Sequence, residues 1–149
     1  MSTEYFEDIN LHQIDRSREY QLNELEIIDF AKQWDPQPFH IDSESAKNTK
    51  FKGLAASGIH LVAICGKLMS EYESKPAFVA GMGFDKFRFK NPARPGDVLA
   101  MEIEAISKRE SQSDPNTGVV CISFRLLNQL NHPVLTGEVV GLVGKRNRL

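Results

Sequence analysis

The spacing of apolar residues changes once along the chain, and the change separates a helical half from a half made of strands. In the first half, apolar positions recur every three to four residues at Ile27, Ala31 and Trp34. This spacing predicts a helix from Asn23 to Gln33, with Asn23 as its N-cap and Glu26 as the return partner of the cap. The Asp35-Pro36 step ends this helix, and a short helix is predicted from Ser43 to Lys47.

The main helix is predicted from about Ala56 to Tyr72, and its first half is apolar on nearly every side. A helix with no polar face is buried. The apolar run from Ile59 to Met69 is interrupted by polar residues and is too short to cross a bilayer. We therefore expect a core helix that other elements must cover.

After Pro76 the apolar period becomes two, which is typical of strands. Alternating segments lie around Phe87, Leu99 and Ile122, and a valine-rich run extends from Val134 to Val143, where Gly137 and Gly141 are interpreted as bulges or close-approach points. A strand near the N-terminus, then helices, then antiparallel strands indicate an α+β fold. The sheet must wrap around the apolar helix.

Composition narrows the possible functions. At 149 residues we expect a single domain, 1–149, and the 18 basic and 20 acidic residues give no reason to expect a nucleic-acid or membrane partner. Cys65 and Cys121 lie in apolar runs without metal-ligand spacing, so we expect free thiols and no metal. The acidic N-terminus lacks a hydrophobic leader segment, and we expect a cytoplasmic protein.

The candidate chemistry begins in the run Trp34-Asp35-Pro36-Gln37-Pro38-Phe39-His40. Proline restricts its own backbone and the residue before it, so we expect a stiff, irregular loop and no helix here. Asp35 and His40 are candidates for proton transfer. Taken singly, Asp35 is better interpreted as an Asx-type turn or helix stop before Pro36, and His40 as a loop histidine with satisfied hydrogen bonds. Taken as a pair, they favour a catalytic site.

A second group of candidates stands at the start of the main helix, in Ala55-Ala56-Ser57-Gly58-Ile59-His60. Gly58 has no side chain to shield its N–H, which is one of the free donors of the first helical turn. Ser57 is better interpreted as a cap than as a nucleophile. His60 is interpreted as a packing or supporting residue with a possible substrate contact.

Together these segments resemble the MaoC-like dehydratase family. The run Trp34–His40 is similar to the family's loop, roughly Gly-Asp-x-Asn-Pro-x-His, and Ala56-Ser57-Gly58-Ile59-His60 is similar to its helix start, Ala-Ser-Gly-Trp-His. Segments Tyr5–Ile9 and Asn91–Leu99 are also similar to the family, and the resemblance extends from about Tyr5 to Lys145.

The resemblance implies a hotdog fold, in which an antiparallel sheet wraps around one long helix, and a homodimer or dimer of dimers. It implies a hydro-lyase that adds water to, or removes it from, an α,β-unsaturated acyl thioester, with coenzyme A as part of the substrate and no other cofactor. Asp35 and His40 would be the catalytic pair. The Gly58 N–H would bind the thioester oxygen, with Ser57 and His60 beside it.

The chain departs from the family pattern at three positions. Gln37 replaces the usual Asn, Trp34 replaces the usual Gly, and Gly66 stands where (R)-hydratases often have Ser. Two other functions stay open. A hotdog thioesterase would place a carboxylate on or near the main helix, which has no acid before Glu71. A non-catalytic acyl-CoA-binding module would keep the pocket without turnover.

Overall fold

The computed structural model describes residues 2–147, and Met1, Arg148 and Leu149 lie outside the described residues. The helices are α1 (Glu24–Trp34), α2 (Pro38–Ile41), α3 (Ser43–Lys47) and α4 (Gly58–Ser70), with a 3-10 turn η1 (Phe6–Asp8). The strands are β1 (Ser2–Glu4), β2 (Ile14–Arg16), β3 (Tyr20–Gln21), β4 (Ser74–Pro76), β5 (Phe78–Phe89), β6 (Val98–Glu110), β7 (Thr117–Leu127) and β8 (Pro133–Gly144). The predicted division into a helical half and a strand half is confirmed.

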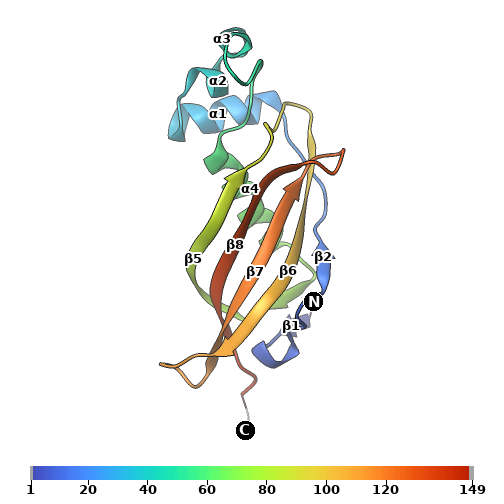
Figure 1. The fold of residues 1–149 in the computed structure, drawn as a ribbon, viewed down its shortest axis with the longest axis vertical. Coiled ribbons are helices and arrows are strands. Elements are labelled where there is room, and N and C mark those ends of the chain that lie inside the picture. The colour runs from blue at the N-terminus through green and yellow to red at the C-terminus, as the bar shows by residue number, and fades with distance from the viewer. Residues whose placement is uncertain (1, 148–149) are drawn as a thin grey trace.

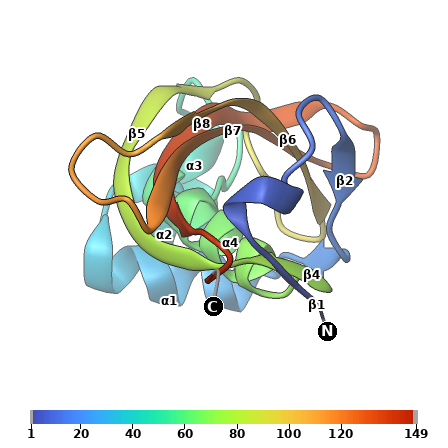
Figure 2. The same ribbon diagram turned by 90° about the horizontal axis from the view of Figure 1, so that it is seen from below.

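One antiparallel sheet dominates the molecule, with its strands in the order β2-β6-β7-β8-β5 and with β3 also paired to β6. A separate parallel pair joins β1 to β4. The sheet curves, and Figure 2 shows α4 lying along its concave side. The predicted α+β fold, a sheet wrapped around one central helix, is confirmed.

Burial of α4 explains this curvature. Leu61, Ile64 and Leu68 line its inward face and are buried in one cluster with the inward side chains of the sheet. Removing apolar surface from water stabilises the fold by roughly 25 cal/mol per Å². The strand residues of the cluster are Leu99, Met101, Phe124, Leu126, Val134 and Leu135. No helix within residues 2–147 has the length and apolar character needed to cross a membrane.

The predicted close approach at Gly137 is also present in the sheet. A Cβ on Gly137 would lie 2.3 Å from Cδ1 of Phe87, so only a residue without a side chain leaves room for that ring. Phe87 packs edge-on against Phe124, with 5.3 Å between the ring centroids. The glycine thus lets β5 place an aromatic side chain over β8 and into the core.

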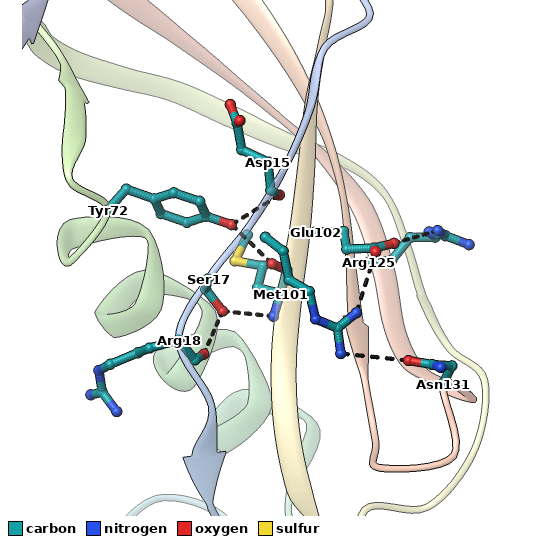
Figure 3. A network of polar contacts seen from close by, with 9 residues as sticks. Asp15, Ser17, Arg18, Tyr72, Met101, Glu102, Arg125 and Asn131 are labelled. Atoms are coloured by element: carbon teal, nitrogen blue, oxygen red, sulfur yellow. Dashed lines mark hydrogen bonds and ion pairs between the residues drawn. The ribbon is translucent and has the colours of Figure 1, made fainter.

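The end of α4 is tied to the sheet by a polar network (Figure 3). The Tyr72 hydroxyl donates to the Met101 carbonyl at 2.9 Å and lies 3.3 Å from the Asp15 carbonyl. Ser17 Oγ accepts from the Met101 N–H at 2.8 Å and donates to the Arg18 carbonyl. Burial raises the pKa of Tyr72, so its hydroxyl stays protonated and remains a donor.

The helices α1, α2 and α3 lie together at one end of the sheet, beside the N-terminal end of α4 (Figure 1). Strand β1 and the C-terminal end of β8 lie toward the other end of the molecule. The candidate residues therefore collect where α1 ends, α2 begins and α4 begins.

Candidate active site

Backbone hydrogen bonds hold Asp35 at the C-terminal end of α1. Its N–H donates to the Ala31 carbonyl at 2.8 Å, and its carbonyl accepts from the Gln37 N–H at 2.8 Å, so the chain turns sharply around Pro36. The predicted Asn23 cap is present, since its side chain accepts from the Glu26 N–H at 2.9 Å. The expected return bond from the Glu26 side chain is not formed, because that carboxylate turns to Tyr20 and His60.

The expectation that Trp34–His40 contains no helix is wrong at both ends of the run. Trp34 is the last residue of α1, and Pro38 opens the one-turn helix α2, which carries His40. Proline is tolerated in the first turn of a helix because the N–H it lacks would have no partner there. Only the segment Asp35–Gln37 is irregular, and it brings the two side chains together.

His40 is buried, and its two ring nitrogens have different surroundings. Nδ1 lies 2.6 Å from the Ala55 carbonyl, which can only accept, so Nδ1 carries the proton and donates it. Nε2 then faces the Asp35 carboxylate, 3.6 Å from Oδ2. This distance is too long for a direct hydrogen bond but allows one water to contact both atoms.

Ser57 lies between the pair and α4. It is fully buried, and its Oγ caps α4 by accepting from the Ile59 N–H at 3.3 Å, which confirms the predicted cap. The same oxygen donates to Asp35 Oδ2 at 2.6 Å. Asp35 and the start of α4 are therefore directly linked.

The segment that precedes α4 is anchored on both sides. Arg94 donates to the Leu54 carbonyl at 3.1 Å and also to the Phe51 carbonyl. The Ala56 N–H donates to the Ala93 carbonyl at 2.9 Å, and the Ala55 N–H donates to the Phe39 carbonyl at 3.1 Å. These bonds fix the carbonyl that orients His40.

Gly58 is the first residue of α4, so its N–H has no acceptor within the helix. The space that its missing side chain leaves is not open, because a Cβ there would lie 2.5 Å from Cζ of Phe89. Phe89 comes from the end of β5 and is 59% exposed. The glycine thus admits an aromatic ring beside the free amide, a neighbour that the sequence did not indicate.

His60 is turned away from this group. Its Nε2 lies 3.2 Å from Glu26 Oε1, and its ring stacks on Phe30 with centroids 4.4 Å apart. Tyr20 donates to Glu26 Oε2 at 2.7 Å, and burial with the neighbouring Glu26 raises the pKa of Tyr20 to about 12. These residues border a cavity of about 450 Å³ between α1 and α4, whose lining includes neither Asp35, His40 nor Gly58.

The structure thus brings together Asp35, His40, Ser57 and Gly58, and it leaves His60 in a separate cluster. The Asp35–Ser57 bond and the Phe89 ring were not anticipated, because both join segments distant in sequence. Within residues 2–147, no group of three His, Cys, Asp or Glu side chains is placed to hold a metal ion.

Comparison with known proteins identifies the family. The model of the MaoC like domain matches residues 9–122. The chain belongs to this family. It is similar to a MaoC-like dehydratase from Rhodospirillum rubrum, with 32% identity, a TM-score of 0.89, and 97% and 99% of the two chains covered. The chain has the hotdog fold, and it is similar in shape, with a TM-score of 0.78, to Rv0216 from Mycobacterium tuberculosis, which has a double hotdog fold.

Two other similar proteins are a hydratase and a protein that has not been characterized. The R-hydratase PhaJ1 from Pseudomonas aeruginosa shares 25% identity and a TM-score of 0.71, with 97% of this chain and 88% of that chain covered. The uncharacterized protein YdeM of Bacillus subtilis strain 168 is 28% identical over 138 residues, which are 92% of this chain and 96% of YdeM. The family in general supports hydratase or dehydratase chemistry.

The contact between Gly58 and Phe89 predicts the effect of adding a single methyl group. Gly58→Ala should destabilise the fold, because its Cβ would overlap the Phe89 ring. Gly66→Ala, in the same helix with nothing within 4 Å, should stabilise it by up to about 1 kcal/mol. Denaturant unfolding measures both. Combining Gly58→Ala with Phe89→Ala should recover part of the loss, and strictly additive effects would contradict the contact.

The His60 cluster predicts a pH dependence of stability. Burial lowers the pKa of His60 below its usual 6.5, although Glu26 opposes the shift. Because the pKa of His60 is lower in the folded state than in the unfolded state, protonation favours the unfolded state. The folded state therefore has its full stability above the unfolded pKa and loses stability as the pH falls below that value. Between about pH 7.5 and pH 5.5, His60→Gln should therefore lose less unfolding free energy than the wild type. The exposed His132→Asn is the control, and equal slopes for His60→Gln and wild type would contradict the prediction.

Proposed function

We propose that this protein adds water to, and removes water from, an α,β-unsaturated acyl thioester, with coenzyme A as the carrier. The observation that carries the proposal is the convergence of a carboxylate, an imidazole and a free helix-start amide in one place. Asp35 Oδ2 lies 3.6 Å from His40 Nε2, and it accepts a hydrogen bond from Ser57, the residue before Gly58. The likeness to an R-hydratase supports the same reaction class.

The geometry suggests how the reaction proceeds. A water between Asp35 and His40 gives one proton to Asp35 while its oxygen bonds to the β-carbon of the substrate. The electron pair of the double bond moves toward the thioester oxygen, which accepts a hydrogen bond from the Gly58 N–H. The α-carbon then takes the proton back from the acid–base pair, so one water is added in total. Dehydration is the reverse.

The amide and the acid–base pair each lower the activation free energy. Acid–base help is worth roughly 10²–10⁴-fold in rate, and one preorganised amide donor contributes about 3–4 kcal/mol to the transition state. His40 can orient the water because its Nδ1 proton is committed to the Ala55 carbonyl, which leaves the Nε2 lone pair free to accept.

A thioesterase is less well supported by the same geometry. Glu71 is the acid nearest the main helix in sequence, and its carboxylate is paired with Arg18 and Lys67 at the far end of α4. These partners lower the pKa of Glu71 to about 2, with Arg18 as the largest cause, so it is a weak base there. A non-catalytic acyl-CoA-binding module is the remaining alternative. Activity assays with enoyl-CoA and acyl-CoA distinguish the hydratase, the thioesterase and the binding module.

We further propose that the protein acts as a homodimer joined along β5. This strand ends the sheet path and pairs only with β8 within residues 2–147. All of its residues except Phe87 are exposed, among them Phe78, Val79, Met82, Phe84 and Phe89. A long apolar strand with a free hydrogen-bonding edge is a template for another strand. Because Phe89 is beside Gly58, a second copy on this edge would also cover the candidate site.

The catalytic assignment predicts the effect of two conservative changes. Asp35→Asn and His40→Gln should each lower kcat for enoyl-CoA hydration by roughly 10²–10⁴-fold, because each removes a proton-transfer group with little change in side-chain size. Loss of the conjugated-thioester absorbance with a panel of enoyl-CoA chain lengths measures the rate.

The exposed His132→Asn should keep the wild-type rate in this assay. Wild-type rates in both active-site variants would overturn the assignment. Release of free thiol from saturated acyl-CoA would indicate a thioesterase, and tight acyl-CoA binding without any turnover would indicate a binding module.

The dimer proposal predicts that a charge on β5 separates the two copies. Met82→Lys should give the mass of a single chain by light scattering at a protein concentration where the wild type has twice that mass, because Met82 is exposed at the centre of the strand. Leu130→Lys places the same charge on the exposed turn between β7 and β8 and should leave the mass unchanged. A monomeric wild type would refute the dimer.

A further inference from the structure

We infer that Ser57 is a positioning residue for Asp35, an inference that rests on the proposed hydratase function. One buried hydroxyl joins the carboxylate that would activate water to the helix start whose amide would hold the thioester oxygen. The other hydrogen bonds between these two segments join Ala55 to Phe39 and to His40, and neither reaches the Asp35 carboxylate.

The direction of each hydrogen bond follows from the partners. A serine hydroxyl has one proton to donate and two lone pairs that accept. Ser57 Oγ accepts from the Ile59 N–H at 3.3 Å, and a carboxylate can only accept, so the single proton goes to Asp35 Oδ2 at 2.6 Å. This length is typical of a hydroxyl that donates to a charged oxygen.

Asp35 needs such an anchor because its side chain has few others. Its carboxylate is 24% exposed, and the backbone on either side is fixed by the Ala31 and Gln37 bonds without constraining the side-chain rotamer. Ser57 is fully buried at the rigid start of α4, so its own position is defined by packing. The Ser57 proton therefore selects the Asp35 rotamer that faces His40 Nε2.

The segment that contains Ser57 also holds His40. Ala55 accepts from His40 Nδ1 at 2.6 Å, and Ser57, two residues later, donates to Asp35. The short segment 55–57 thus orients both members of the acid–base pair, and it leads directly into the Gly58 amide. Reacting groups must be held to a fraction of an ångström, and misplacement by about 1 Å can cost roughly 100-fold in rate.

The test compares Ser57→Ala with the wild type in enoyl-CoA hydration. We expect kcat to fall roughly 10- to 100-fold while KM stays within about twofold, because Ser57 touches the base and not the carrier part of the substrate. Ser57→Gly should show the same loss of kcat. Because glycine is a better N-cap residue than alanine, this variant replaces Ser57→Ala in the test if Ser57→Ala does not fold.

Asn23→Ala is the matched control for lost capping. It removes a side-chain cap of similar geometry from α1, the helix that ends at Asp35, without touching the carboxylate. We expect a lower Tm but an unchanged kcat in Asn23→Ala. If Ser57→Ala has an unchanged kcat and only a lower Tm, then Ser57 is a cap alone and the inference is overturned.

A crystal structure of Ser57→Ala separates an effect through Asp35 from an effect through Gly58. We expect the Asp35 carboxylate in another rotamer, with the backbone at Gly58 unmoved. An unmoved Asp35 with a displaced Gly58 backbone would overturn the inference. Wild-type rates in Asp35→Asn and His40→Gln would instead remove the hydratase proposal itself, so the two failures are distinguishable.

Discussion

The apolar surface of α4 can leave water only if the sheet curves around it, and this requirement organises the rest of the molecule. Leu61, Ile64 and Leu68 face the inward side chains of β6, β7 and β8. Because the inward face of the helix packs against the sheet along its length, its free N–H groups lie at one end of the sheet, where α1 and α2 lie (Figure 1). A partial positive charge collects at this end. The candidate chemistry lies there because the fold places the N-terminus of α4 beside the end of α1 and the start of α2.

Secondary structure alone does not bring the acid and the imidazole together at this end. Pro36 and Pro38 make the connection between α1 and α2 short and stiff. The final orientation comes from hydrogen bonds to the segment before α4, which accepts from His40 and donates to Asp35. Arg94 holds that segment through its carbonyls. The site is therefore a product of local stiffness and of long-range anchoring, and neither suffices without the other.

This division explains what the sequence could predict. The period of apolar residues predicted α1 to within a residue and the central helix to within two, because periodicity reflects burial directly. The short helix α3 was also predicted with its bounds. The apolar period wrongly predicted that Trp34, the last position of the apolar stripe, faces the core, because this side chain is 66% exposed. The Asp35–His40 spacing indicated a pair, but the partners of Gly58 and His60 could not be foreseen. Phe89 and Glu26 lie 31 and 34 residues away along the chain, and no local pattern records such contacts.

The proposed thioester substrate would find apolar contacts beside the Gly58 amide. Two large apolar side chains at the start of α4 are mostly exposed: Phe89, whose ring lies against Gly58, and Ile59, the next residue along the chain. Exposed apolar groups beside a free amide are costly in water unless a ligand or a second chain covers them. An acyl chain offers apolar cover while its carbonyl reaches the amide, and a partner strand on β5 would enclose the same surface. Covering the site would also exclude bulk water, which strengthens the electrostatic contribution of the Gly58 amide.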